Sequence, residues 1–153
     1  MTDGPRPVAD AVTVIVPTMG GPVLQGCLES IVSGTVWPAR LVVIDQGGGN
    51  ATADWAAAVR KQGMGVLLVP ANPAGISAAT NRGLQHVRTR YAAVTHDDCR
   101  VRSDWLERLA ARLAQIGDAI LTGRVEPEGE GIVLTVKTAD RPAIYTSPLL
   151  DGD

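Results

Sequence analysis

The chain has 153 residues, of which 45% are hydrophobic and 3% aromatic, and it contains no phenylalanine. This length suits one domain, and its core must consist of valine, leucine, isoleucine and alanine. The net charge of −2 and the lack of a basic stripe argue against nucleic acid as the main partner. No apolar run approaches the ~20 residues that a membrane-spanning helix needs.

Two features of the sequence bear on where the protein is located in the cell: its N-terminus and its cysteines. Residues 1–10 are polar and contain proline, unlike a signal peptide. Cys27 and Cys99 could form one disulfide, but so few cysteines favour reduced thiols in a cytosolic protein. The sequence therefore predicts a cytoplasmic protein. Peripheral contact with a membrane stays open, although no segment favours it.

Short apolar runs alternate with helical patterns along the chain. In chain order they predict a strand at 12–16, a helix at 22–33, a strand at 41–44, a helix at 52–62, a strand at 65–69, a helix at 76–88, a strand at 91–95 and a helix at 103–115. Ser103 can cap the last helix and Gly117 can end it. Further strands are expected at 119–123 and 132–137.

This order of elements predicts an α/β fold with a doubly wound, mainly parallel sheet and a short mixed C-terminal extension. The strands are apolar throughout, as expected when helices cover both faces. Right-handed crossovers leave few topologies, and we expect the strand order 3-2-1-4. Such a sheet changes winding direction between its first and fourth strands, and ligands bind there at the carboxyl ends of the strands.

The four residues His96-Asp97-Asp98-Cys99 follow the fourth predicted strand. Two adjacent carboxylates repel each other unless a cation joins them. Mg²⁺ typically takes one or two carboxylates together with substrate phosphates, so the pair predicts a metal–phosphate site. The alternative is a solvated acidic turn before a helix, where aspartate also suits the helix dipole.

Polar or glycine residues follow the other strands as well. The first strand is followed by 17–21, the second by Asp45 and the glycines 47–49, and the third by 72–75. Because the carboxyl ends of parallel strands share one edge, these loops predict a common ligand site. Asp45 stands where nucleotide-binding sheets place a ribose- or base-binding carboxylate. Any one of these loops alone would be ordinary loop composition.

With these residues placed, the chain resembles the N-terminal, nucleotide-sugar-binding part of a family 2 glycosyltransferase with the GT-A fold. The resemblance covers about residues 12–123 and extends more weakly to 150. It implies one donor-binding domain over 1–153 that lacks the acceptor-binding half. Four motifs carry it: Val14-Ile-Val-Pro-Thr18, Val43-Ile-Asp-Gln46, Asn72-Pro-Ala-Gly-Ile-Ser-Ala-Ala-Thr-Asn-Arg-Gly83, and Thr95-His-Asp-Asp-Cys99 followed by Trp105-Leu106.

The resemblance implies a role for the residues that match the family around the donor. Pro17 and Thr18 would lie beside the nucleotide base and ribose, and Asp45 would bond the base. The donor pocket would be lined by Gly75, Asn81 and Gly83. The neighbouring Arg82 could reach phosphate or base, or lie in solvent as an ordinary helix residue.

The acidic motif would handle the diphosphate. Asp97 would face the ribose or the diphosphate, and Asp98 would hold the Mg²⁺ or Mn²⁺ that bridges it. The first acid of the family's motif is His96 here, which is either a metal ligand or a pocket histidine. The family's catalytic base is an acid of the acceptor half, expected beyond Asp153, so the catalytic residue is unknown.

Taken together, the resemblance implies metal-assisted transfer of a sugar, with inversion, from a nucleotide-diphosphate sugar to a glycan, lipid or small-molecule acceptor. The intact donor motifs favour an enzyme for the gene product from which the chain comes, whereas the missing acceptor half favours binding without turnover for this chain as given. The alternative is a nucleotide-sugar-binding module or fragment without turnover. A nucleotidyltransferase fits less well, since the loop Met19-Gly-Gly-Pro22 carries no cation.

Overall fold

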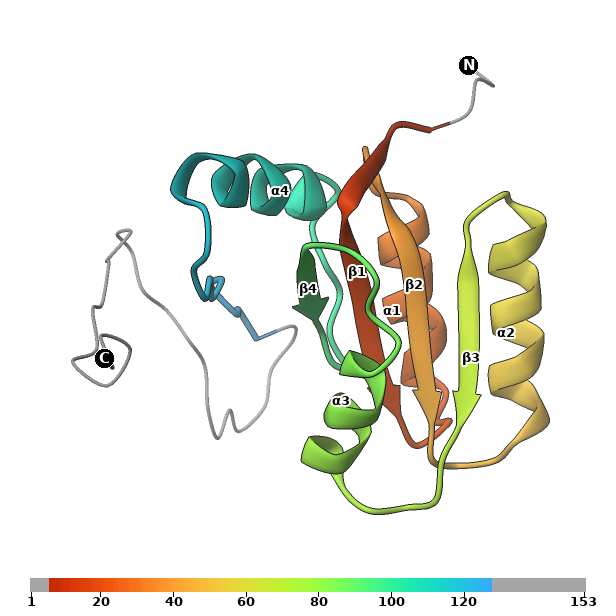
Figure 1. Ribbon diagram of the computed structural model, residues 1–153. Helices are drawn as coiled ribbons and strands as arrows, with labels where there is room; N and C mark the ends of the chain where they lie inside the picture. The colour runs from red at the N-terminus through yellow and green to blue at the C-terminus, as the bar shows by residue number, and fades with distance from the viewer. Residues whose placement is uncertain (1–5, 128–153) are drawn as a thin grey trace, which may run out of the picture. The chain divides into compact units, whose positions relative to one another are not determined.

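The computed structural model describes residues 6–127, in which four strands and four helices alternate. In chain order they are β1 (Val8–Thr18), α1 (Val23–Val32), β2 (Trp37–Asp45), α2 (Asn50–Lys61), β3 (Val66–Pro70), α3 (Ile76–Leu84), β4 (Tyr91–Val94) and α4 (Trp105–Ile116). All four strands run parallel in the order β3-β2-β1-β4 (Figure 1). The predicted α/β class and strand order are confirmed.

Helices cover both faces of the sheet, which explains why its strands are apolar at successive positions. Val14 and Val16 of β1 pack on one face with Leu28 of α1, while Ile15 packs on the other with Ala79 of α3. Figure 1 shows α3 in front of the sheet and α1 behind it. Each such fully buried side chain contributes about 1.5–3 kcal/mol of transfer free energy.

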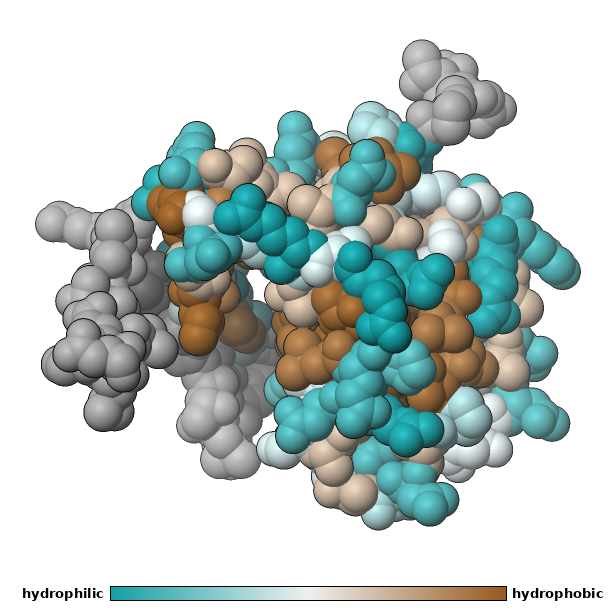
Figure 2. All heavy atoms as spheres, viewed as in Figure 1, coloured by the Kyte–Doolittle hydropathy of each residue, from teal (hydrophilic) through white to brown (hydrophobic). Residues whose placement is uncertain are grey.

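Helix α3 leaves part of the front face of the sheet uncovered (Figure 2). Apolar side chains are visible among the polar ones from that side (Figure 2), and Leu67 of β3 is half-buried. Helix α3 lies close to β1 because Gly83 has no side chain, and a Cβ there would overlap Cγ2 of Ile15. Gly83 is therefore a packing residue of the core.

Several boundaries differ from the predicted ones: β1 begins at Val8 instead of residue 12, and β2 begins at Trp37 instead of residue 41. Helix α3 ends at Leu84, so the predicted helix at 76–88 is too long. After it, His86 donates to the carbonyl of Gly83 over 2.9 Å and Val87 donates to that of Leu84 over 3.1 Å. These tighter i to i+3 bonds turn the chain towards β4. The apolar spacing continues through the turn and does not reveal it.

The predicted cap of the last helix is also wrong. Helix α4 begins at Trp105 after Asp104, which makes no side-chain cap. The carbonyl of Ser103 instead accepts the N–H of Thr35 over 2.9 Å, which joins the start of α4 to the loop after α1. Gly117 ends the helix as predicted, with a φ of 75° and an N–H that bonds the carbonyl of Leu113.

The chain divides into two compact units, Met1–Gly117 and Asp118–Asp153. In the described part of the second unit, residues 118–127, there is no helix or strand, so the strand predicted at 119–123 is wrong. A strand needs a neighbour for its backbone, and 119–123 pairs with none among the described residues. The strand predicted at 132–137, and the mixed extension with it, lie outside the described residues. Within 6–127, no helix is both long and apolar enough to cross a membrane.

Candidate functional site

Three residues at the ends of neighbouring strands stand in one row across the sheet. The register pairs Thr18 of β1 with Asp45 of β2, and Asp45 with Pro70 of β3. Thr18 is 3% exposed and Asp45 is 5% exposed. Polar groups this deeply buried need hydrogen-bond partners, so the bonds that they make show how the edge is built.

Thr18 joins the end of β1 to the loop that follows β4. Its hydroxyl donates to Oδ2 of Asp97 over 2.6 Å and accepts the N–H of Gly20 over 2.9 Å. The bond holds the half-buried carboxylate of Asp97 where β1 and β4 meet, which is the point at which the sheet changes its winding direction. The structure thus brings together two of the predicted site residues.

We expect the Thr18→Val variant to keep the shape of the core and to lose the bond to Asp97. A hydrogen bond to a charged group contributes about 1.5–3 kcal/mol, so chemical denaturation should show a loss of stability of that order. A freed Asp97 should also weaken, several-fold in calorimetry, the metal-dependent nucleotide binding that the family resemblance implies. The matched control is Thr13→Val, which removes the bond between Thr13 in the middle of β1 and Thr89. Equal nucleotide affinity in the two variants would refute a positioning role for Thr18.

Asp45 is oriented by the loop that follows it. Its Oδ1 accepts the N–H groups of Gly47 over 2.9 Å and of Gly48 over 3.2 Å. Its backbone carbonyl accepts the N–H of Ala71 over 2.8 Å, which ties it to the exit of β3. Within residues 6–127 no hydrogen bond ends on Oδ2. One carboxylate oxygen is therefore used for positioning, and the other can accept a donor from a ligand.

Gln46 is a functional candidate that the sequence analysis left without a role. It is 6% exposed, its N–H donates to the carbonyl of Thr18 over 2.9 Å, and its Oε1 accepts the N–H of Ala74 over 2.9 Å. One residue therefore links the loops after three strands. In the sequence, the sign of this role is a glutamine that follows Asp45 directly after the apolar run 41–44.

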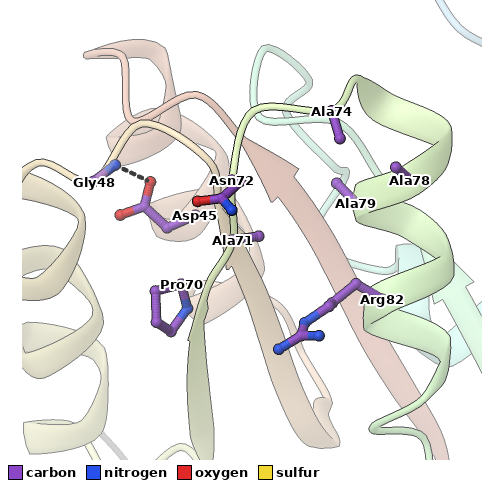
Figure 3. A pocket seen from close by; sticks show the side chains of 9 residues that line it. All are labelled: Asp45, Gly48, Pro70, Ala71, Asn72, Ala74, Ala78, Ala79 and Arg82. Carbon is purple, nitrogen blue, oxygen red and sulfur yellow. Dashed lines mark hydrogen bonds between the residues drawn. The ribbon is translucent and has the colours of Figure 1, made fainter.

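A cavity of about 520 Å³ opens beside Asp45, between the ends of β2 and β3 and one face of α3. The loop 70–74 forms one wall, and Ala78, Ala79 and Arg82 of α3 form another (Figure 3). This volume falls in the usual range of pockets for small ligands. The small alanine side chains leave a slot. Among the described residues, the polar side chains that line it are those of Asp45, Asn72 and Arg82.

A second hollow of about 390 Å³ lies between α3 and the end of β4. Ser77, Thr80 and Asn81 of α3 line it together with Val94 and His96. Asn81 and Asp45 therefore belong to different hollows. The structure brings the predicted Asn81 beside His96.

The remaining predicted residues surround these hollows. Pro17 is buried within β1 opposite Ile44 and lines neither hollow. Gly75 stands at the start of α3 with a φ of 85°, a conformation that suits glycine. Asp98 is exposed, and its Oδ1 lies 3.6 Å from Sγ of Cys99.

The loop 96–99 is anchored to α1 by a cysteine. The carbonyl of His96 accepts both the thiol of Cys27 over 3.3 Å and the N–H of Cys99 over 3.1 Å. Burial raises the pKa of Cys27 to about 12, and the nearby Cys99, Asp97 and Asp98 add to the effect. Burial and then Asp98 also raise the pKa of Cys99. Both cysteines are free, and at neutral pH Cys27 stays a thiol that can donate.

The acidic loop could hold a metal ion only with help from a ligand. Among residues 6–127, no three His, Cys, Asp or Glu side chains gather in a way that could hold one by themselves. The exposed Asp98 offers hard carboxylate oxygens, and Asp97 beside it adds charge. This set matches the way in which Mg²⁺ is bound through one or two carboxylates and completed by substrate phosphates.

Residues 13–148 match the sequence model of glycosyl transferase family 2. The chain belongs to this family. The resemblance found in its four motifs is thereby confirmed. The curated family 2 relative glycosyltransferase GlyA of Streptococcus pneumoniae serotype 4 is 28% identical over 117 residues, which are 76% of this chain and 17% of GlyA. The chain thus spans less than a fifth of that relative.

Solved structures share the fold of this family 2 chain. Residues 1–349 of TarS from S. aureus, in complex with UDP-GlcNAc, match with a TM-score of 0.60 and 16% identity over 72% of this chain and 37% of that one. The mannosyltransferase PcManGT of Pyrobaculum calidifontis, in complex with GDP-Man and Mn²⁺, matches with a TM-score of 0.56 and 23% identity over 74% of this chain and 33% of that one. At these identities the likeness concerns the fold, which is GT-A-like as predicted.

Proposed function

We propose that this chain binds a nucleotide-diphosphate sugar as the donor part of a glycosyltransferase. One observation carries the proposal: Asp45 and Asp97 are both held at the same edge of the sheet, each by a specific hydrogen bond. Asp45 faces a cavity of about 520 Å³, and Asp97 stands next to the exposed Asp98. A nucleoside diphosphate needs a slot that takes its base and a group of carboxylates that binds its phosphates through a metal ion.

Each side chain at this edge then has a task in binding. Asp45 accepts an N–H of the base through Oδ2, while Gly47 and Gly48 keep the carboxylate in place. Thr18 holds Asp97 towards the ribose or the diphosphate. Pro17 comes directly before Thr18 in β1, and its ring fixes the backbone that carries this contact.

The sugar end of the donor belongs beside α3. Asn81 lines the second hollow and offers amide donors and acceptors to sugar hydroxyls. Gly75 begins the helix without a side chain that would narrow the approach. In this arrangement the base lies in the cavity beside Asp45 and the sugar lies in the second hollow, beside Asn81. The two hollows are on different sides of α3.

Asp98 is the residue that we expect to hold Mg²⁺ or Mn²⁺. Its exposed carboxylate fits a hard dication, and the fold relative PcManGT was solved with Mn²⁺ and GDP-Man. When bound, the dication neutralises the charge that develops on the departing diphosphate. Asp97 and Asp98 orient the diphosphate so that the anomeric carbon faces the open side of the site.

In the proposed reaction the sugar passes to an acceptor hydroxyl with inversion, and a carboxylate base accepts the proton of that hydroxyl. We place that base beyond Asp153 and treat 1–153 as the donor-binding domain. The chain spans 17% of GlyA, which also favours a second reading, in which this chain binds the donor without turnover. Release of nucleoside diphosphate from a nucleotide sugar, measured with the chain alone, separates the two readings.

Thermal-shift measurements with a panel of nucleotides test donor binding. We expect UDP-GlcNAc or GDP-Man to raise the melting temperature in Mn²⁺, and much less in EDTA. At 100 times Kd a ligand specific for the native state adds about 2.7 kcal/mol of stability. Inorganic diphosphate with Mn²⁺ is the control for charge alone. A panel in which no nucleotide exceeds that control would refute the proposal.

A further inference from the structure

Two charged side chains line the cavity among the described residues, and they come from different elements. Asp45 enters from the end of β2, and Arg82 enters from α3 (Figure 3). Within residues 6–127, the side chain of Arg82 makes no hydrogen bond or ion pair, and it is exposed towards the slot. The cavity thus offers an acceptor on one side and a fork of N–H donors on another.

The helix separates Arg82 from the phosphate end of the site. Its neighbour Asn81 lines the hollow next to His96, whereas Arg82 lines the cavity that ends on Asp45. The acids Asp97 and Asp98 follow β4, on the far side of β1 from β3. Arg82 is therefore placed to meet the base rather than the diphosphate.

Guanine satisfies both side chains more fully than the other common bases do. Guanine carries N1–H and N2–H₂ donors on one edge, which suit a carboxylate, and the O6 and N7 acceptors on another, which suit arginine. Uracil has a single N–H between two carbonyls, and the edge opposite to it is carbon. Adenine and cytosine present a ring-nitrogen acceptor beside their amino group, which a carboxylate repels.

We propose that Arg82 is a specificity-determining residue that makes the donor site selective for guanine nucleotides. This inference rests on the proposed function and names the nucleotide that the site takes. Asp45 accepts from the N1–H and N2–H₂ edge, and the guanidinium of Arg82 donates to O6 and N7. The planar fork of arginine matches this pair of acceptors better than a lysine ammonium would.

Calorimetry of the 153-residue chain in Mn²⁺ tests the inference, with GDP, UDP and 7-deaza-GDP as probes. We expect GDP to bind at least about tenfold more tightly than UDP, in line with the discrimination of a bidentate arginine–guanine pair. Arg82→Ala should weaken GDP about tenfold and leave UDP within about twofold. Since 7-deaza-GDP lacks N7, it should bind the wild type more weakly than GDP does. The R82A variant should no longer distinguish the two.

Arg112→Ala is the matched control, because Arg112 is an exposed arginine on α4 outside both hollows. It should change none of these affinities. Equal binding of GDP and UDP to the wild type, or a loss on Arg82→Ala that is the same for both, overturns the inference and leaves the proposed function intact. Failure of every nucleotide to bind in Mn²⁺ overturns the proposed function and the inference together.

Discussion

The Asp98→Asn variant is expected to lose the metal-dependent part of nucleotide binding. Asparagine keeps the size of the side chain and removes the charge that a dication needs. We expect Kd for a nucleoside diphosphate in Mn²⁺ to rise at least about tenfold, because the ion then has lost its protein carboxylate. Replacing Mn²⁺ with EDTA should weaken the wild type strongly and the D98N variant hardly at all.

The control for this prediction is Asp54→Asn, which removes the same charge from an exposed position on α2. It should bind nucleotide like the wild type, with the same metal dependence. Calorimetry of the three proteins in Mn²⁺ and in EDTA gives the six affinities that the comparison needs. If D98N and the wild type respond equally to EDTA, Asp98 is not the metal ligand.

The second large effect is expected at Gly47, where two loops of the site touch. A Cβ at this position would overlap the backbone carbonyl of Met19, so the loops after β1 and β2 can meet only if residue 47 is glycine. Backbone cannot move aside as a flexible side chain does. We expect Gly47→Ala to cost about 3 kcal/mol in chemical denaturation, the upper part of the range for overpacking.

The same variant should also weaken nucleotide binding, because the N–H of Gly47 orients Asp45. Gly21→Ala is the matched control in the facing loop, where an added Cβ would meet nothing closer than 4.0 Å. Its effect should stay within about 0.5 kcal/mol, as for ordinary surface substitutions. A G47A variant as stable as G21A would show that the two loops are not in contact.

The order of strands in this fold was predictable because its central strands contain unbroken apolar runs and are separated by helices of clear periodicity. β1 and β2 are buried on both faces, which leaves unbroken runs such as Val14-Ile-Val and Leu41-Val-Val-Ile in the sequence. The predictions were wrong where the spacing of apolar residues does not follow the course of the backbone. Apolar spacing continues past Leu84 although the chain turns there, and the apolar run at 119–123 forms no strand.

The candidate site was predictable only as far as topology places residues at one edge. That argument correctly puts Thr18, Asp45 and Asp97 near each other, but it does not show that Thr18 donates to Asp97, 79 positions further along the chain. The role of Gln46 depends on how the loop after β3 folds back over it. Likewise, Arg82 and Asn81 line separate hollows because of the way in which α3 is rotated about its axis. The packing of α3 on β1 sets that rotation.

The central claim is that Asp98 and its neighbours bind the diphosphate through a dication while Asp45 binds the base. A crystal of this chain soaked with GDP and Mn²⁺ tests it most directly, because the anomalous signal locates the ion independently of the nucleotide. We predict a manganese peak at the carboxylate of Asp98, with the base in the cavity beside Asp45. A nucleotide bound elsewhere, with Asp97 and Asp98 free of metal, would contradict this account.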